Sequence, residues 1–281
     1  NFSCDKVDSW RKDACKALIN LYNATDGDHW TRSWGWLYYN DICAWSGVIC
    51  GGYATLDLRN NGLKGSLPPD FYVKGIMRYD LGENQLGPNL SIDFEKMNYV
   101  ETLRLDNNLF RGMLPAGLNK LEIVNVLDLS NNQFTGPLPI LQNVEWNKIR
   151  TLKLAGNQFT GSIPSDLADR FPELIDLDLS DNLLTGSIPW QIELLPNLRS
   201  FAAHHNQLTG EIPEGIGFMN RLSLLDLQGN QLTGPIPTSF GNLPLQRLKL
   251  SNNRLSGPIP EELFSPNTQN LEILELANNQ F

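Results

Sequence analysis

The segment Leu127–Pro139 reads LDLSNNQFTGPLP, and it returns almost unchanged as LKLAGNQFTGSIP from Leu152 and as LDLSDNLLTGSIP from Leu177. Each copy opens with Leu-x-Leu, continues with an Asn three residues after the second leucine, and closes with Gly-x-Leu/Ile-Pro. The Asn recurs at intervals of 23 to 26 residues, at Asn61, Asn84, Asn108, Asn132, Asn157, Asn182, Asn206, Asn230, Asn253 and Asn279. A period of this length indicates one small structural unit stacked many times.

The spacing within one unit predicts how it folds. Leu-x-Leu has a period of two, so both leucines of a short strand lie on the same side. One strand cannot bury them alone, but parallel copies form a continuous core in which each buried Leu contributes about 1.5–3 kcal/mol. The Asn amide is expected to satisfy backbone groups where the chain turns away. Gly permits a close backbone approach, and Pro ends the extended segment.

The pattern L-x-L-x-x-N-x-[LF]-x-G-x-[IL]-P closely resembles the plant-specific class of extracellular leucine-rich repeats. This class occurs in receptor-kinase ectodomains, receptor-like proteins and polygalacturonase-inhibiting proteins. The resemblance covers residues 53–281. It implies an α/β solenoid, a right-handed superhelix with a parallel β-sheet on its concave side and a second short extended ladder near the Gly-x-Ile-Pro segments.

Residues 1–52 are predicted to form an N-terminal cap, because a stacked solenoid leaves its first core layer exposed. The segment CAWSGVIC, from Cys43 to Cys50, resembles the plant-type cap. The segment ALINLYNATDGDHW before it resembles caps of leucine-rich-repeat proteins from algae and other microbial eukaryotes.

The cap is expected to contain a helix over residues 8–22 with Asp8 or Ser9 as its N-cap. Its apolar residues fall on one helical face, at Trp10, Ala14, Ala17, Leu18 and Leu21. Four tryptophans follow, Trp30, Trp34, Trp36 and Trp45. We expect them to pack over the end of the leucine column, with stacking on a carbohydrate ring as the alternative.

All four cysteines lie in the first fifty residues, at Cys4, Cys15, Cys43 and Cys50. They allow three pairings, of which we favour the two local ones, Cys4–Cys15 and Cys43–Cys50. Zinc spacings such as C-x2-C are absent, so disulfides and an oxidising, extracellular compartment are predicted. Three N-x-S/T sequons agree with N-linked glycosylation in the secretory pathway, at Asn1, Asn23 and Asn89.

The formal net charge of −9 disfavours nucleic acid or an anionic membrane as the main partner. No apolar run approaches the ~18 residues of a transmembrane helix, so no membrane contact is expected within this segment. The chain starts at Asn1 without Met, which is typical of a processed N-terminus. It stops within a repeat at Phe281, and we expect the native chain to continue with more repeats, a cap or a membrane anchor.

The central position of Leu-x-Leu is predicted to face solvent on the concave sheet. This column alternates in charge over most of its length, in the order Asp57, Asp80, Arg104, Asp128, Lys153, Asp178, Ala202, Asp226, Lys249 and Glu275. Because neighbouring strands lie about 4.8 Å apart, like charges in the column would repel. The alternation by itself indicates a self-compensating ladder that keeps an exposed sheet soluble.

Repeat seven, LRSFAAHHNQLTG, departs from the pattern with Phe201 and Ala203 in the leucine positions and two histidines after them. Ala202 interrupts the charge column, and we predict a ligand-binding region around it, comprising Lys153, Asp176, Asp178, Asp181, His204, His205 and Asp226. An Asp/His group can bind a divalent metal or a basic ligand. A polar protein or peptide contact is favoured, and no metal or cofactor is predicted.

No catalytic motif or water-excluding cleft is expected, so the chain is predicted not to be an enzyme. The threonines that precede the repeat glycines form a possible ice-matching column, which is common in ordinary members of the class. The favoured function is an extracellular recognition module that binds a protein, peptide or cell-wall glycan. The alternatives are a structural or adhesive scaffold of the matrix or cell surface and, third, an inhibitor of a secreted hydrolase.

Overall fold

The computed structural model describes residues 2–8, 11–138, 146–265 and 268–281. It divides into two compact units, Asn1–Phe134 and Thr135–Phe281. Among the described residues, no helix has the length and apolar character needed to cross a membrane. The division into a cap at 1–52 and repeats at 53–281 stays a prediction from the sequence.

The sheet of the first unit is built from the Leu-x-Leu segments. Its strands follow one another in chain order, β1 (Val48–Ile49), β2 (Thr55–Asp57), β4 (Arg78–Asp80), β6 (Thr102–Arg104) and β8 (Val126–Asp128). The strands from β2 onward are parallel, and β1 lies antiparallel to β2 with Val48 opposite Leu56. The repeat-to-repeat register is constant, as the sequence period requires.

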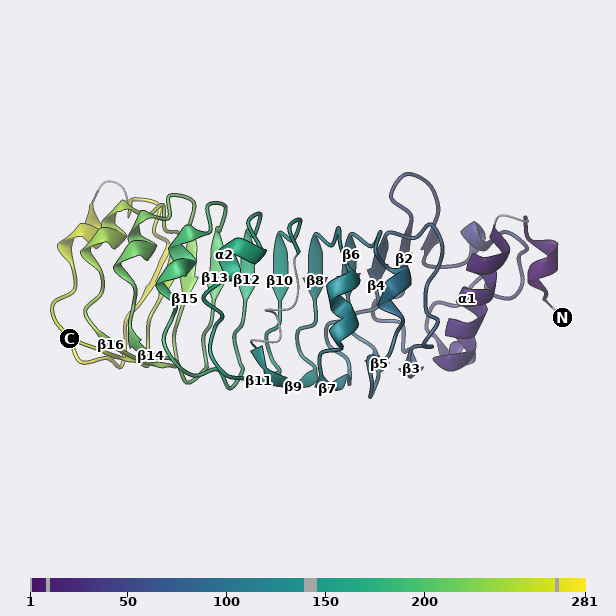
Figure 1. Ribbon diagram of the computed structural model, residues 1–281, viewed down its shortest axis with the longest axis horizontal. Helices are drawn as coiled ribbons and strands as arrows, with labels where there is room; N and C mark the ends of the chain where they lie inside the picture. The colour runs from purple at the N-terminus through teal and green to yellow at the C-terminus, as the bar shows by residue number, and fades with distance from the viewer. Residues whose placement is uncertain (1, 9–10, 139–145, 266–267) are drawn as a thin grey trace. The chain divides into compact units, whose positions relative to one another are not determined.

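The second unit continues the same pattern. Its strands also follow chain order, β10 (Thr151–Lys153), β12 (Asp176–Asp178), β13 (Ser200–Ala202), β15 (Leu224–Asp226), β17 (Arg247–Lys249) and β19 (Ile273–Glu275). All are parallel and in register, so that Leu177, Phe201 and Leu225 stand opposite one another. Figure 1 shows the short helices of this unit in front of its strands.

A second set of short strands forms the ladder that the resemblance implies. In the first unit these strands are β3 (Lys64–Gly65), β5 (Gln85–Leu86) and β7 (Arg111–Met113), and β9 (Gln133–Pro137) begins there. In the second they are β11 (Gln158–Thr160), β14 (Thr209–Glu211), β16 (Gln231–Gly234) and β18 (Arg254–Leu255). β3 and β5 are parallel, as are β14, β16 and β18, and β14 and β16 run along the lower edge in Figure 1.

The return paths of most repeats contain a 3₁₀ helix. Within the described residues, the α-helices are α1 (Lys12–Ala24) and α2 (Leu167–Arg170). The 3₁₀ helices are η1 (Cys4–Lys6), η3 (Gly27–His29), η4 (Ile42–Ala44), η5 (Phe94–Lys96), η6 (Ala116–Lys120), η8 (Trp190–Leu194), η9 (Glu214–Phe218), η10 (Thr238–Asn242) and η11 (Glu261–Phe264). In several repeats the pattern proline is the N-cap, as Pro189 is for η8 and Pro213 is for η9.

The repeated Asn performs the role predicted for it. The Asn182 amide nitrogen donates to the carbonyls of Leu179 and Ser180 at 3.2 and 2.9 Å, and to that of Leu154 in the preceding repeat at 3.0 Å. Its oxygen accepts from the Phe159 backbone N–H at 2.9 Å. The side chain therefore satisfies buried backbone groups of two repeats at once, which joins each repeat to the next.

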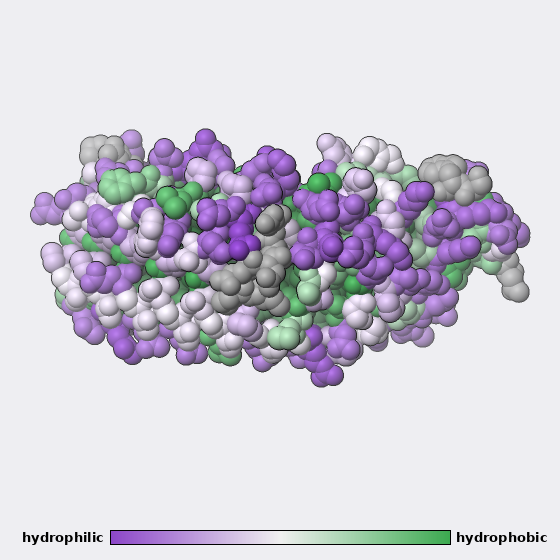
Figure 2. All heavy atoms as spheres, in the orientation of Figure 1, coloured by the Kyte–Doolittle hydropathy of each residue, from purple (hydrophilic) through white to green (hydrophobic). Residues whose placement is uncertain are grey.

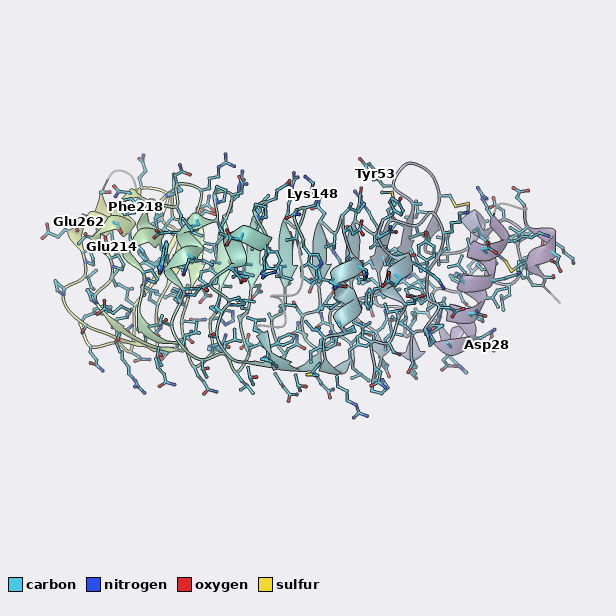
Figure 3. The ribbon with its side chains drawn as sticks, viewed as in Figure 1. Asp28, Tyr53, Lys148, Glu214, Phe218 and Glu262 are labelled. Atoms are coloured by element: carbon cyan, nitrogen blue, oxygen red, sulfur yellow. A yellow bond between two sulfur atoms is a disulfide. The ribbon has the colours of Figure 1, made fainter. Side chains whose placement is uncertain are left out.

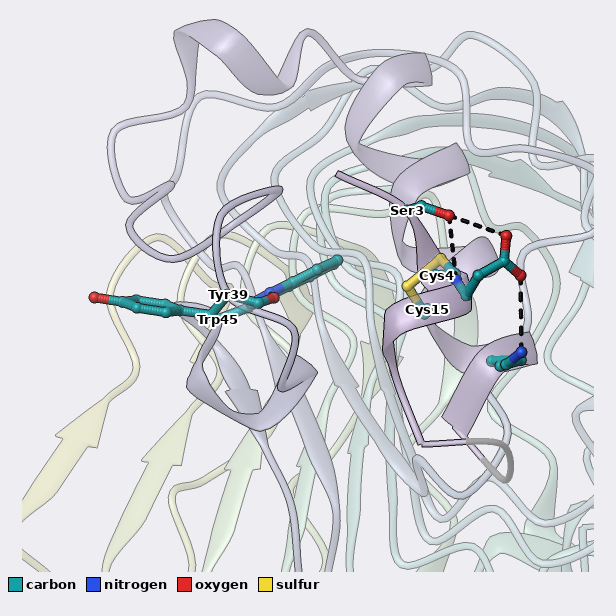
Figure 4. The surroundings of a disulfide bond; sticks show 7 residues. Ser3, Cys4, Cys15, Tyr39 and Trp45 are labelled. Atoms are coloured by element: carbon teal, nitrogen blue, oxygen red, sulfur yellow. Dashed lines mark hydrogen bonds and ion pairs between the residues drawn. A yellow bond between two sulfur atoms is a disulfide. The ribbon is translucent and has the colours of Figure 1, made fainter. Parts of the chain in front are cut away.

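The cap has both predicted disulfides, Cys4–Cys15 and Cys43–Cys50. Figure 4 shows the first of them, where Asp5 accepts from the Ser3 hydroxyl and its carboxylate lies 3.7 Å from the Lys12 amine. The pairing confirms the two local bridges and links the start of the chain to α1.

The cap tryptophans are only partly as predicted. Trp30, Trp36 and Trp45 are buried. The ring centroid of Trp36 lies 4.9 Å from that of Trp30 and 4.8 Å from that of Trp45. Figure 4 shows Trp45 beside Tyr39, whose carbonyl accepts from its indole N–H at 2.9 Å. Trp34 is 69% exposed, so the prediction that all four tryptophans pack in the core is wrong.

The cap helix also begins later than predicted. α1 has Arg11 as its N-cap without a side-chain cap bond, while the Asp8 carbonyl accepts from the Arg11 N–H in a separate turn. Asp8 is therefore not the N-cap, and Ser9 and Trp10 lie outside the described residues. The helix ends at Ala24 with Thr25 as its C-cap, whose backbone N–H and hydroxyl both donate to the Leu21 carbonyl.

Repeat seven keeps its core despite its altered leucine positions. Phe201 and Ala203 are both buried, and Phe201 stands opposite a leucine in each neighbouring strand. A larger ring beside a methyl group keeps the volume of this core layer close to that of two leucines.

Candidate functional site

The predicted charge column exists on the exposed face of the sheet. In the first unit Asp57, Asp80, Arg104 and Asp128 stand opposite one another on successive strands. In the second unit the column is Lys153, Asp178, Ala202, Asp226, Lys249 and Glu275. The column brings basic and acidic groups together, as at Lys249 and Glu275, whose charged atoms lie 3.3 Å apart.

The first unit carries a hollow of about 430 Å³ on this face. Its charged lining comes from three neighbouring strands and the residue before β6, namely Asp57, Arg78, Asp80, Glu101 and Arg104. Arg78 pairs with Glu101 at 3.6 Å and Arg104 with Asp80 at 3.9 Å. These distances are long for ion pairs, and the side chains stay partly exposed, so both signs of charge are open to a ligand.

Arg78 is the most unusual group of this hollow. Its guanidinium lies over the ring of Tyr53, 4.4 Å from the centroid, and Figure 3 shows Tyr53 projecting from the loop before β2. The Arg78 Nε–H is buried and has no hydrogen-bond partner among the described residues. The Arg78 side chain is nevertheless 43% exposed, so its guanidinium can donate to a carboxylate that enters the hollow.

The sequence interpretation did not include this hollow. Arg78 and Glu101 lie before the Leu-x-Leu position, whereas the predicted charge column comprises only the central residue of each Leu-x-Leu segment. The available signal was a pair of opposite charges at adjacent offsets in successive repeats, since Arg78 stands opposite Thr102 and Glu101 is the residue before Thr102.

A charge network lies next to the hollow where the strands end. The Arg59 guanidinium pairs with Asp80 at 3.3 Å, Glu83 at 2.9 Å and Asp106 at 2.8 Å. Burial alone would raise the pKa of the Asp106 carboxyl, but hydrogen bonds from Arg59 and Asn107 outweigh it and hold the pKa below its ordinary value. The same hydrogen bond from Arg59 to Asp106 raises the pKa of the guanidinium. The network thus fixes the turns of three repeats.

The predicted region of the second unit is only partly a cluster. Lys153 pairs with Asp176 at 3.5 Å. Asp178 accepts from the Ser180 backbone N–H at 3.1 Å, so its carboxylate caps its own turn. Burial raises the pKa of the Asp226 carboxyl, against the lowering effect of the nearby His204 and Lys249 charges.

Asp181, His204 and His205 form the compact part of this region. His205 Nδ1 lies 2.9 Å from Asp181 Oδ1, His204 Nδ1 lies 3.7 Å from Asp181 Oδ2, and the two Nδ1 atoms are 3.3 Å apart. The rings are nearly perpendicular. Asp181 and His205 are exposed and His204 is half-buried, so one group of three potential ligands is open to solvent.

A row of exposed apolar side chains was not predicted. Leu194, Phe218 and Phe264 are the last residues of η8, η9 and η11, and they are 53%, 71% and 69% exposed. Figure 2 shows hydrophobic side chains among hydrophilic ones over these helices, where Figure 3 labels Phe218. Leu and Phe at these positions resemble core residues in the sequence, because the return path has no fixed periodicity.

The predicted glycosylation sites can be placed for two of the three sequons. Asn23 and Asn89 are exposed, the first on α1 and the second in the loop after β5. Asn1 lies outside the described residues.

The predicted threonine column is not a straight row. Thr209 stands opposite Gln231, and Thr233 stands opposite Glu211, so the hydroxyls of successive repeats are offset by two positions. A regular hydroxyl lattice is therefore absent from this pair of strands.

Comparison with known proteins identifies the repeat. The Leucine Rich Repeat family matches six segments, residues 54–73, 124–143, 148–169, 173–195, 221–243 and 244–265. A search of curated proteins found no match.

Solved plant receptors share the fold. The plant peptide hormone receptor RGFR1 in complex with RGF2 is 31% identical with a TM-score of 0.74, over 80% of this chain and 36% of that one. The ectodomain of the Arabidopsis thaliana receptor kinase GASSHO1/SCHENGEN3, in complex with CASPARIAN STRIP INTEGRITY FACTOR 2, is 28% identical with a TM-score of 0.74, over 95% and 35%. The chain thus spans about a third of the length of these receptor chains.

A plant ice-binding protein has the same fold at a similar length. It is 21% identical with a TM-score of 0.69, and the match covers 95% of this chain and 97% of that one. At this identity the likeness concerns the fold alone.

Proposed function

The chain is a leucine-rich-repeat protein with the fold of plant receptor ectodomains, and on that premise we propose that it is an extracellular, non-catalytic recognition module for an extended peptide. The peptide binds on the exposed sheet face of the first unit, in the hollow around Arg78 and Arg104. Two disulfides and exposed sequons support a secretory protein. The receptors RGFR1 and GASSHO1/SCHENGEN3 are themselves in complex with RGF2 and CASPARIAN STRIP INTEGRITY FACTOR 2.

The observation that carries this proposal is the open charge pairing of the hollow. Arg78 and Arg104 can each donate hydrogen bonds to a carboxylate, while Asp80 and Glu101 can accept hydrogen bonds from backbone or basic donors of the same ligand. The Arg78 side chain is 43% exposed, so the exposed part of its guanidinium can donate to a ligand carboxylate. A peptide carries both carboxylates and N–H donors along an extended backbone. A hollow lined by both acidic and basic side chains therefore suits a peptide better than a ligand with charge of one sign.

The test is a selection of peptides on the purified protein. A displayed library of random peptides is enriched on the wild type, and the selected peptides are then measured by calorimetry on Arg104→Glu. We expect at least about tenfold weaker binding, because charge reversal opposes a charge-assisted hydrogen bond of about 1.5–3 kcal/mol. Lys249→Glu is the matched control, since Lys249 holds the same column position beside an acidic partner in the second unit.

Two results would count against the peptide site. One is a set of selected peptides that bind Arg104→Glu as well as they bind the wild type. The other is equal loss in Arg104→Glu and Lys249→Glu, which would indicate general charge attraction rather than the hollow.

The exposed apolar row favours one second function, a self-associating scaffold. Leu194, Phe218 and Phe264 project from equivalent helix ends, and each leaves more than half of its surface exposed to water. Aromatic side chains of this size provide most of the energy of protein contacts. We expect Phe218→Ser with Phe264→Ser to abolish any concentration-dependent association seen by sedimentation, whereas Tyr99→Ser, which alters an exposed ring of the first unit, leaves it unchanged. A wild type that stays monomeric at high concentration excludes the scaffold.

A further inference from the structure

Asp181, His204 and His205 direct three potential metal ligands at one point. Asp181 follows β12, and the two histidines follow β13 in the next repeat. The three atom pairs are 2.9, 3.3 and 3.7 Å apart. Neutral imidazole nitrogens and a carboxylate oxygen are the ligands that Zn²⁺ takes together most often after thiolates.

These distances match a tetrahedral site. With Zn–N and Zn–O bonds of about 2.0–2.2 Å, two ligands of a tetrahedron are separated by roughly 3.3–3.6 Å. The three measured separations lie on both sides of that value. The two histidines approach different oxygens of Asp181. Small shifts of these side chains, with a rotation of the Asp181 carboxylate, would therefore place both Nδ1 atoms and one carboxylate oxygen on one ion.

His205 occupies the left-handed position that recurs in the repeats, and Gly229 leaves room for its imidazole. His205 has φ 52°, in the left-handed region, where the equivalent residues of other repeats include Asn131, Asn252 and Gly229. A left-handed residue other than Gly or Asn is uncommon. Gly229 provides the space, because a Cβ atom there would lie 2.4 Å from His205 Cδ2.

Neighbouring repeats also hold the ligands in place. The Asp181 N–H donates to the His204 carbonyl, and the His205 N–H donates to the Gln228 carbonyl, each at 2.9 Å. Three consecutive repeats thus fix the positions from which the side chains converge. Preorganisation of this kind reduces the cost of assembling a metal site.

We propose that Asp181, His204 and His205 bind a divalent metal ion of the zinc type, with a fourth coordination position open to solvent. The alternative use of the same geometry is an ion pair between Asp181 and a protonated histidine, which needs no metal. The two differ in one measurable respect, which is whether the protein binds Zn²⁺ alone.

The experiment titrates the purified chain with Zn²⁺ by calorimetry and repeats the titration with variants that keep the backbone. His205→Asn introduces the residue that other repeats carry at this left-handed position, and His204→Ser introduces the residue found at Ser180 and Ser251. The control is His29→Asn. His29 is the one histidine of the sequence outside the cluster, and its Nδ1 lies 2.6 Å from Asp26 Oδ1.

We expect one Zn²⁺ per wild-type chain, and binding at least about tenfold weaker in both cluster variants, since even outer-shell changes cost 10–100-fold in affinity. His29→Asn should bind as the wild type does. Visible absorption of the Co²⁺ form should report a four-coordinate site in the wild type and lose that signature in His205→Asn.

The proposal fails if the wild type does not bind Zn²⁺, or if His205→Asn and His29→Asn bind it equally. The probe is the metal alone, and the three residues belong to the second unit. The outcome of the Zn²⁺ titration is therefore independent of the peptide test on the first unit.

Discussion

Arg59 and Asp106, 47 residues apart in the sequence, are joined by two hydrogen bonds of 2.9 and 2.8 Å. The Asp106 side chain is only 6% exposed, while that of Arg59 is 32% exposed. A bidentate pair of this kind is among the stronger polar interactions in proteins. Because Arg59 also contacts Asp80 and Glu83, one guanidinium links three successive turns.

The first prediction concerns stability in acid. The pKa of Asp106 is lowered from its ordinary value of 3.8 in the folded protein. The stabilisation that this carboxylate contributes is therefore complete above about pH 4 and is lost as the pH falls through the folded pKa. We expect the wild type to lose more unfolding free energy between pH 5 and about pH 2 than Asp106→Asn does. Urea denaturation at a series of pH values measures this, and equal slopes for the two proteins would contradict it.

A second prediction uses the glycine beneath the network. A Cβ atom at Gly82 would lie 2.3 Å from Arg59 Nη1 and 2.6 Å from Asp106 Oδ1. Gly82→Ala should therefore displace the ion pair and destabilise the fold by about 1–3 kcal/mol, the usual cost of overpacking. Gly52→Ala is the matched control because nothing lies within 4 Å of its added Cβ. Thermal denaturation of both variants decides the matter, and a Gly82→Ala protein as stable as Gly52→Ala would show that the pair does not need this space.

The fold could be predicted from the sequence because the same buried and turn positions recur in each repeat. Leu-x-Leu positions are buried, and the amide of Asn182 forms the bonds expected of it. Where a segment occurs only once, the prediction was weaker. The start of α1 was misplaced, and Trp34 was assigned to the core, because neither a cap without repeats nor a lone tryptophan provides a second copy against which to check its position.

The candidate sites were less predictable than the fold. Asp181, His204 and His205 could be grouped from the sequence because a constant register places equivalent residues of adjacent repeats side by side. The partnership of Arg78 with Tyr53 depends on a loop before the first repeat strand. The apolar row at Phe218 depends on the direction of 3₁₀-helical return segments, which the repeat pattern does not determine.

A third prediction measures the Asn ladder. Asn182→Ala would leave the buried Phe159 N–H without its acceptor. The three carbonyls that the amide contacts each keep one other donor. One buried backbone group left unpaired costs about 1–3 kcal/mol, so we expect a loss of about 1–3 kcal/mol in unfolding free energy. Asn119→Ala, at an exposed position of η6, should change stability little, and comparable losses in the two variants would argue against the ladder.

The fourth prediction concerns Asn89. This residue is exposed in a loop outside the sheet, between Pro88 and the buried Leu90, so a glycan there would not cover the charge column. Mass spectrometry of protein from a eukaryotic source should find hexose-bearing peptides that contain Asn89, and Asn89→Gln should remove them. Recovery of the unmodified peptide alone would reject the site.

The last prediction concerns binding by the charged face of the second unit. Charge reversal at Asp178 and Asp226 should weaken binding of a basic peptide by about tenfold or more, since both carboxylates stand in the exposed column beside Ala202. Reversal of Asp178 also removes the acceptor that caps its turn. The separating variant is therefore Asp178→Asn with Asp226→Asn, which removes both charges and keeps both acceptors. Loss of affinity in the Asn pair, with an unchanged melting temperature, assigns the effect to charge. If the affinity of the reversed variant equals that of the wild type, the Asp176–Asp226 region is not a binding surface for basic peptides.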